Sequence, residues 1–390
     1  MKRIFTICTV AFSIALTSCE KKEEYLTPQL RTKVSITSLD STKYTANFKD
    51  AEGDSTVDRT EGRKYNSLFL GLASYIRVTT DSLKPLNETK IKNIYSNTNN
   101  EYTGTYAALN STGLQIKSTV ASSFSSSEAD KIRKDIEGFL VKIVKASASV
   151  ADTASNGKAG RIFTTDFKLK YLVDSNGIEW GQVAQKALIG VYQLDYIGNI
   201  LLANTSANNS VLIAGTNSTQ LELNWDKAYG VLTQKDVYGS GFATAPKLTS
   251  GESQLGAYAW EYNPYNPQTA KCLTDLHKLF LKGRAAVVNN DKTLMATYGN
   301  EIRLTFEKAL AKSALGYLAK WKTGADDATK AHALGEGLGF IYALRACKLS
   351  GADVAFSDNL FNTIITTGYW NLTVEQVNTI QTAIQTKFNL

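Results

Sequence analysis

The sequence predicts a mainly α-helical protein, a multi-helix bundle with a short irregular or β N-terminal segment and one hairpin excursion. Only 5 prolines occur among the 390 residues, so few positions interrupt a helix. From Arg63 onward, apolar residues recur at spacings of three and four, which is the period of an amphipathic helix. Residues 25–60 alternate only weakly and lack this period. The helices are expected to form one bundle or two packed bundles.

The first 18 residues have the pattern of a bacterial lipoprotein signal. Lys2 and Arg3 precede an apolar run, Ile4–Leu16, that is too short to span a membrane. The run ends in Leu16-Thr17-Ser18-Cys19, which resembles the lipobox. This resemblance implies cleavage before Cys19 and lipidation of its sulfur. We therefore expect residues 1–18 to be removed and Cys19 to anchor the mature chain to a membrane.

A charged tether follows Cys19. Residues 20–24 read Glu-Lys-Lys-Glu-Glu, similar to the signal that directs Bacteroidetes lipoproteins to the outer face of the outer membrane. A solvated leash explains the same charges equally well. We predict that residues 19–60 form a tether and an extended segment and that residues 61–390 form the helical domain. The expected location is the outer membrane, with the cell-surface side favoured over the periplasmic side.

The apolar pattern predicts a series of helices along the domain. Two glycine-rich turns, at 154–160 and 174–177, enclose Gly160–Val173, which we predict to be the hairpin. The run 178–203 is apolar on more than one stripe and should be central in the core. The predicted helices lie near residues 63–79, 88–95, 113–119, 128–150, 178–203, 220–232, 253–261, 267–289, 299–321, 328–348, 357–366 and 373–388.

Charge and cysteine content exclude several classes of function. The net charge of +7 falls to +5 when Lys2 and Arg3 leave with the signal, and basic residues form no blocks. This distribution argues against nucleic acid as a partner. Cys272 and Cys347 lie on apolar helical stretches, where either buried free thiols or a disulfide would fit. No Cys-x-x-Cys occurs, which excludes a thiolate zinc site and a redox motif.

The stretch 330–346 contains the strongest candidate for a site. His332 and Glu336 are one helical turn apart and share a face. Gly335, Gly337 and Gly339 cluster in the same helix, which indicates that a neighbouring helix or a ligand approaches its backbone closely. His332 and Glu336 could hold a metal ion together with ligands from other helices. The alternative is that His332 hydrogen-bonds a carboxylate or carbonyl inside the bundle.

A second group of candidates combines aromatic and charged residues. Trp225, Asp226 and Tyr229 share one helical edge and could line a pocket for a polar or aromatic ligand. Arg284 follows Gly283 and could bind an anion. The alternative is a bundle core in which Asp226 pairs with an arginine such as Arg284. Further candidate ligands on predicted helices are His277, Glu179, Asp195 and Glu307.

Several motifs resemble one family in order and over nearly the whole mature chain. The matching motifs are Asp54-Ser-Thr-Val57-Asp58 with Gly62-Arg63 and Asn66, Asn156–Gly160, Val173–Gln182, Lys186-x-Leu188-x-Gly190, Trp225-Asp226-x-Ala228-Tyr229-Gly230, Gly283–Ala286 and Ala331–Leu334. Together they resemble the group of Bacteroidetes lipoproteins called DUF4856, and the resemblance implies a helical envelope lipoprotein whose relatives look like companions of iron-uptake systems. A more remote likeness is to imelysin-like helical proteins with a Gly-x-His-x-x-Glu motif, although here Lys330 replaces the glycine and Glu336 is one residue further from His332.

These observations favour a binding function over catalysis. The chain has no Walker motif, no His-Glu-x-x-His, no Gly-x-Ser-x-Gly and no dinucleotide-binding glycine loop. We therefore expect an accessory lipoprotein that binds a metal ion, a metal complex or a peptide for an outer-membrane transporter. One alternative is a hydrolase with His332 and Glu336 as base or metal ligands. The other is a structural surface protein without a small ligand.

Overall fold

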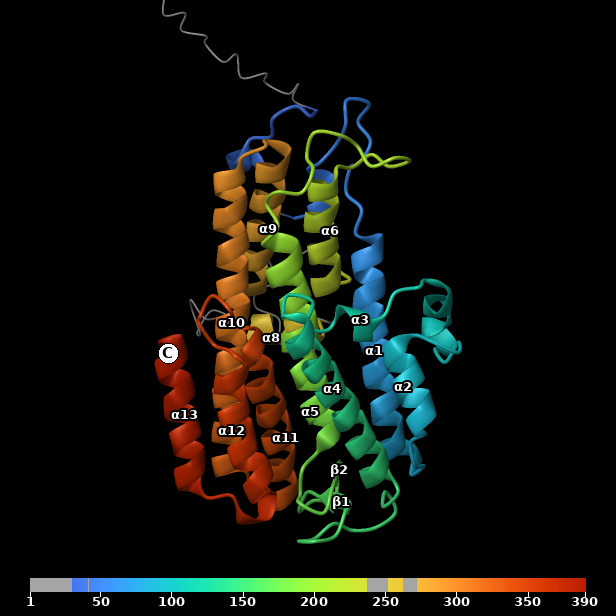
Figure 1. Cartoon of the computed structure of the whole chain (residues 1–390), viewed down its shortest axis with the longest axis vertical. Coiled ribbons are helices and arrows are strands. Elements are labelled where there is room, and N and C mark those ends of the chain that lie inside the picture. The colour runs from blue at the N-terminus through green and yellow to red at the C-terminus, as the bar shows by residue number, and fades with distance from the viewer. Residues whose placement is uncertain (1–29, 41, 237–251, 262–271) are drawn as a thin grey trace, which may run out of the picture.

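The computed structural model describes residues 30–40, 42–236, 252–261 and 272–390. Within these residues the chain forms an elongated bundle of helices with one small sheet, which confirms the mainly α-helical prediction (Figure 1). The predicted signal, Cys19 and the charged tether lie outside the described residues. None of the described helices is long and apolar enough to cross a membrane.

The helices follow the predicted order. Short 3-10 turns, η1 (Ile36–Ser38) and η2 (Tyr44–Ala46), precede the first α-helix. The remaining elements are α1 (Thr60–Ser82), α2 (Glu88–Ser96), η3 (Gly104–Ser111), α3 (Ile116–Thr119), α4 (Ser126–Ser147), β1 (Gly160–Phe163), β2 (Lys170–Val173), α5 (Trp180–Leu188), η4 (Ile189–Leu202), α6 (Gln220–Leu232), α8 (Gln254–Glu261), α9 (Cys272–Val288), α10 (Lys292–Thr323), α11 (Asp327–Ala343), η6 (Leu344–Ala346), α12 (Val354–Thr367), η7 (Tyr369–Asn371) and α13 (Val374–Phe388).

Side-chain caps fix where several of these helices begin. Ser125 and Thr219 each complete a capping box, with Glu128 and Glu222 respectively. Asp326 caps α11 by accepting a hydrogen bond from the backbone N–H of Thr329. Each cap satisfies backbone N–H groups that the first helical turn leaves without a partner. The capping residue next to it therefore fixes where α11 begins, and with it the position of His332 along the bundle.

The predicted helix at 178–203 changes its hydrogen-bonding pattern part-way along. It runs as α5 to Leu188 and then continues as a π-helix, η4, over Ile189–Leu202. Most η4 side chains are buried, so the run is central in the core as expected. A π-helix this long is rare, because most occur as single-turn bulges inside α-helices. The apolar composition that predicted the run carries no signal for the change.

The glycines of α11 allow two helices to pack against it closely. A Cβ atom added at Gly335 would lie 3.0 Å from the Cβ of Glu179, and one at Gly339 would lie 2.7 Å from the carbonyl oxygen of Val183. Gly337 faces α10 instead, where an added Cβ would be 3.4 Å from the Cβ of Tyr317. The glycine cluster therefore reflects a neighbouring helix, one of the two predicted explanations. It brings α5 beside the face of α11 that carries the site residues.

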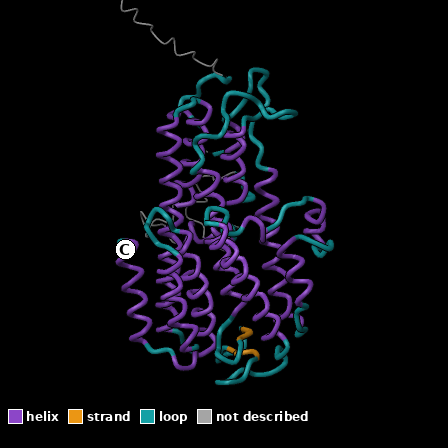
Figure 2. Tube along the Cα trace, viewed as in Figure 1, coloured by secondary structure: helices purple, strands orange, loops and turns teal. Residues whose placement is uncertain are grey.

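The predicted hairpin is confirmed at the end of the molecule opposite the N-terminal segment (Figure 2). Strands β1 and β2 pair antiparallel, with Gly160 opposite Val173 and Phe163 opposite Lys170. At the other end, residues 30–40 and 42–59 cross the ends of α6, α9 and α10 with little regular structure (Figure 1). We call these described residues the N-terminal strap. Cys347 is a buried free thiol, so the disulfide considered for it is not formed.

Candidate functional site

The candidate residues fall into two groups in different halves of the bundle. Trp225, Asp226 and Tyr229 lie on α6 and Arg284 lies on α9, in the half next to the N-terminal strap (Figure 1). His332 and Glu336 lie on α11 in the other half. The sequence motifs suggested two separate groups, and the structure keeps these groups apart. A single site made from all six residues is therefore not present.

Arg284 is the centre of a buried ion-pair network. Its side chain is fully buried, and its Nε lies 2.9 Å from Asp226 Oδ1 while its Nη1 lies 3.0 Å from Glu222 Oε1. The remaining nitrogen donates to Thr56 Oγ1 at 3.2 Å. Asp226 also accepts hydrogen bonds from the Tyr44 hydroxyl at 2.9 Å and from the backbone N–H of Asp58 at 3.2 Å.

We call this network, with Arg31 at its edge, the Arg284 cluster. Arg31 Nε contacts Glu222 Oε1 at 2.8 Å, so each of the two carboxylates is held by groups from the N-terminal strap as well as by Arg284. Burial raises the pKa of Asp226 to about 6, against the opposing charge of Arg284. Burial alone would raise the pKa of Glu222, but Arg284 and Arg31 outweigh burial and lower it. The cluster joins the strap to the helices and has its polar groups satisfied internally.

Trp225 and Tyr229 are packed core residues. Trp225 donates from Nε1 to the carbonyl oxygen of Phe280 at 2.7 Å. A Cβ atom at Gly283 would lie 1.7 Å from the Trp225 ring, so the indole rests directly on that glycine. The Tyr229 hydroxyl lies 2.9 Å from His277 Nδ1, and its ring stacks on Tyr44 with centroids 4.2 Å apart. Of the two interpretations of this group, the core with an Asp226–Arg284 ion pair is the one observed.

His332 and Glu336 belong to a second network, which is completed by α5. His332 Nδ1 lies 2.7 Å from Glu179 Oε2, and its Nε2 lies 3.7 Å from Glu336 Oε2. Lys186 Nζ contacts Glu336 Oε1 at 3.0 Å. The Tyr171 ring stacks on the imidazole, with centroids 4.1 Å apart. We call Glu179, Lys186, His332 and Glu336 the His332 cluster.

The electrostatics of the His332 cluster favour a charged imidazole. Burial alone would lower the pKa of His332, but the carboxylates of Glu179 and Glu336 outweigh burial and raise it. Burial would raise the pKa of Glu336, but Lys186 and His332 outweigh it and lower that pKa. Burial raises the pKa of Glu179 against the opposing charge of His332. With all four groups charged, the cluster is neutral, because two carboxylates face two cations.

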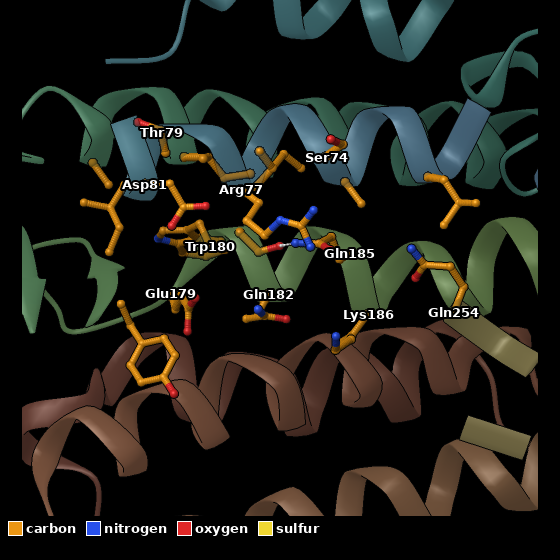
Figure 3. A pocket seen from close by; sticks show the side chains of 18 of the residues that line it. Ser74, Arg77, Thr79, Asp81, Glu179, Trp180, Gln182, Gln185, Lys186 and Gln254 are labelled. Atoms are coloured by element: carbon orange, nitrogen blue, oxygen red, sulfur yellow. Dashed lines mark hydrogen bonds between the residues drawn. The ribbon is translucent and has the colours of Figure 1, made fainter. Parts of the chain in front are cut away.

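A cleft of about 500 Å³ lies beside this cluster, between α1 and α5, and Glu179 and Lys186 are part of its wall (Figure 3). Gln185 lines it from α5, and Arg77 and Asp81 face it from α1, whereas Gln182, which also lines it, is drawn on the side of α5 away from α1. This volume is within the range of small-molecule sites. The cleft therefore combines unpaired polar groups with a buried neutral charge network along one wall.

The comparison with known families supplies the context for both clusters. A family model described as a domain of unknown function, DUF4856, matches residues 42–390. The chain belongs to the DUF4856 family. No curated protein and no solved structure matches it. The remote likeness to imelysin-like proteins therefore stays a prediction, as do the Bacteroidetes origin and the lipid anchor.

The DUF4856 match includes both clusters and the cleft. It begins at residue 42, so it covers Tyr44 and Thr56 of the N-terminal strap but not Arg31. Glu179, Gln182 and Lys186 lie within the motifs that carried the resemblance in the sequence, which was the available signal for the cleft. Arg77 lies outside those motifs. An arginine in an amphipathic helix is usually a solvated residue, so sequence alone did not single it out.

The candidate side chains described above are not arranged to bind a bare metal ion. Within the described ranges, no group of three or more His, Cys, Asp or Glu side chains is arranged to hold one. His332 directs one ring nitrogen at Glu179 and the other at Glu336, and Lys186 occupies the position beside Glu336 where a cation would bind. The other candidate carboxylates have protein partners. Glu307 accepts from the backbone N–H groups of Leu349 and Ser350, and Asp195 from Ser123.

Proposed function

We propose that this protein is an envelope lipoprotein that binds a small polar organic molecule in the cleft between α1 and α5. The observation that carries the proposal is the cleft of about 500 Å³ with Arg77 and Gln182 in its wall. Arg77 and Asp81 have no ion-pair partner among the described residues, so a ligand that carries groups of opposite charge could pair with them.

An accessory role with an outer-membrane transporter fits the same proposal. The lipobox-like end of the leader, Leu16–Cys19, and the charged residues after it support a lipid anchor. The resemblance to companions of iron-uptake systems suggests the transporter as partner. The donor set described above favours an organic ligand over a free metal ion, so the expected cargo is the organic molecule or a complex that presents one.

A hydrolase is less well supported by the His332 cluster. The contact between His332 and Glu179 resembles the base and orienting carboxylate of many hydrolases. In such sites the second ring nitrogen faces a nucleophile or a water molecule. Here it faces Glu336 at 3.7 Å. This geometry favours an ion-pair network that shapes a binding cleft.

A thermal-shift screen of the purified lipoprotein tests the proposal. Separate panels would contain amino acids and peptides, sugars, organic acids, and transition-metal salts. We expect at least one organic panel to raise the unfolding temperature, because a ligand at 100 times its Kd stabilises the folded state by about 2.7 kcal/mol. Metal salts alone should have no such effect.

A matched pair of variants links any stabilisation to the cleft. Ser74 lines the cleft, whereas Ser82 is exposed at the end of the same helix and does not. Ser74→Trp should remove the ligand-induced shift, and Ser82→Trp should retain it. The proposal fails if no organic ligand stabilises the wild-type protein, or if the shift persists in Ser74→Trp.

A further inference from the structure

A loop next to the N-terminal strap exposes two consecutive aliphatic side chains. The loop, residues 203–219, connects η4 to α6 at the same end of the bundle as the strap (Figure 1). Within it, Val211 is 59% exposed and Leu212 is 42% exposed. Leu30, where the described part of the strap begins, is also exposed. We call Leu30, Val211 and Leu212 the apolar rim.

The strap and the loop meet, so the apolar rim belongs to one surface. Leu30 and Ser210, the residue before Val211, line the same groove of about 700 Å³. Arg31 also donates a hydrogen bond to the carbonyl oxygen of Asn217 in the loop. Two segments that are far apart in the sequence therefore place their exposed apolar side chains at one end of the molecule.

Hydrogen bonds fix the loop on both sides of its exposed pair. Asn209 Nδ2 donates to the carbonyl oxygen of Val287 on α9 at 2.8 Å, and Asn209 Oδ1 accepts from Thr219 Oγ1 at 2.8 Å. Leu212 pairs with Thr219 in an isolated antiparallel bridge. The loop is thus held against α6 and α9, and it leaves the side chains of Val211 and Leu212 in water, where apolar surface is unfavourable.

The proposed lipid anchor would place this end of the bundle beside a bilayer. Cys19 is 11 residues before Leu30, and a chain of that length spans at most about 40 Å. The hairpin has exposed apolar side chains too, Phe167 at 77% and Leu169 at 54%, but it lies at the opposite end (Figure 2). The 32 residues of α10, about 48 Å long, run between the two ends.

Charge gives this end of the molecule no preference for anionic lipids. Lys33 and Lys292 are exposed and line the groove. The turn at residues 50–54 contains three acidic residues and contacts the same loop, because Asn217 donates to the carboxylate of Asp50. With charges of both signs present, the apolar side chains are the groups for which contact with a bilayer would be favourable.

We propose that the apolar rim is a membrane-contact surface, which inserts into the headgroup region of the phospholipid bilayer that carries the lipid anchor. This inference rests on the anchor in the proposed function and adds an orientation to it. The strap end faces the bilayer, and the hairpin points away from it. Because the acyl chains already hold the protein at the membrane, the apolar rim determines orientation more than affinity.

Fluorescence quenching in vesicles tests the contact. The acylated lipoprotein would be reconstituted into phosphatidylcholine vesicles that contain a nitroxide-labelled lipid. A thiol-reactive dye would be attached through Ala214→Cys in the loop or through Lys168→Cys in the hairpin, both exposed positions, and wild type treated with the dye would give the background. We expect quenching at position 214 to exceed that at position 168 by about 3-fold or more, because the inserted side chains bring the loop to headgroup depth. Added phosphatidylglycerol should change it little.

Two double variants provide the matched comparison. Val211→Ser with Leu212→Ser removes the apolar side chains of the loop, and Phe167→Ser with Leu169→Ser removes exposed apolar side chains at the opposite end. The first should lower quenching at position 214 by about 3-fold or more, because buried apolar area drives the insertion. The second should leave that quenching unchanged. Both variants alter exposed side chains, so both should keep the unfolding temperature of wild type.

Different failures have different meanings. If position 214 is quenched no more than position 168, or if Val211→Ser with Leu212→Ser leaves the quenching unchanged, the apolar rim does not contact the bilayer and the inference is overturned in favour of a protein partner. If the lipoprotein is not retained on the vesicles at all, the anchor in the proposed function is wrong, and the inference fails with it. Ligand binding in the cleft is measured separately by the thermal-shift screen and does not depend on either result.

Discussion

The Arg284 cluster and the His332 cluster are both buried charge networks between helices, but they differ in what they leave unused. In the Arg284 cluster, the guanidinium is fully buried and its partners include Thr56, Glu222 and Asp226. The His332 cluster pairs its own four charges, yet two of its members form a wall of a cleft whose opposite wall carries Arg77 without a partner. Full internal pairing indicates a structural role, whereas unpaired groups beside a cleft support the proposed binding site.

The largest expected effect is on stability, at Arg284. Arg284→Met removes a buried cation. The buried carboxylates of Glu222 and Asp226 then lose the positive charge that both are paired with. Breaking one side of a buried ion-pair network costs about 3–5 kcal/mol. Urea unfolding should show a loss in the free energy of unfolding of that size. A loss below about 1 kcal/mol would mean that the network does not hold the strap in place. It would contradict the structural role inferred for the Arg284 cluster.

A smaller effect, dependent on pH, is expected at His332. The pKa of His332 in the folded protein is raised above its ordinary value of 6.5. The folded state therefore keeps the proton over a range in which the unfolded chain has released it. This contribution to stability is complete below pH 6.5 and is lost as the pH rises through the raised pKa.

His332→Gln provides the measurement of that contribution. The glutamine amide can donate to Glu179 as a neutral imidazole does, but it cannot carry the charge. The variant should be less stable than wild type by about 1–2 kcal/mol at pH 6, and the difference should shrink as the pH rises to 9. Urea unfolding at several pH values between 6 and 9 gives the comparison. A difference that stays constant or grows with pH would contradict a charged imidazole in this cluster.

The smallest expected effect on stability is at Arg77. Arg77→Met removes an exposed side chain that has no partner in the described chain, so the free energy of unfolding should change by less than about 0.5 kcal/mol. The same substitution at Arg284 provides the contrast. If Arg77→Met is as destabilising as Arg284→Met, then Arg77 has a structural role and the distinction between the two regions disappears.

Sequence analysis predicted local features well because they depend on neighbouring residues. The helical period placed His332 and Glu336 on one face, and the glycines of α11 correctly indicated a close approach, which Gly335 and Gly339 provide for α5. The turns around Gly160–Val173 predicted the hairpin. These signals lie within one or two helical turns, or within one turn motif, where spacing determines geometry.

Features that depend on packing between distant segments were not predictable in the same way. Glu179 is 153 residues from His332 in the chain, so it entered the sequence analysis only as one of several carboxylates. The π-helical pattern of Ile189–Leu202 depends on hydrogen bonds and leaves no trace in an apolar composition. The cleft is lined by residues of α1, α5 and β2, which are far apart in the chain, and no motif in the sequence records such a space.

The N-terminal strap also determines how the molecule would respond to mechanical force. A pull from the N-terminal side would first load the contact between Arg31 and Glu222, and then the pair of hydrogen bonds between Val34 and Asn289, at 2.8 and 2.9 Å. Only after these had opened would the load reach Tyr44 and the core of the Arg284 cluster. The strap would therefore open contact by contact before the load reached α1 and the cleft.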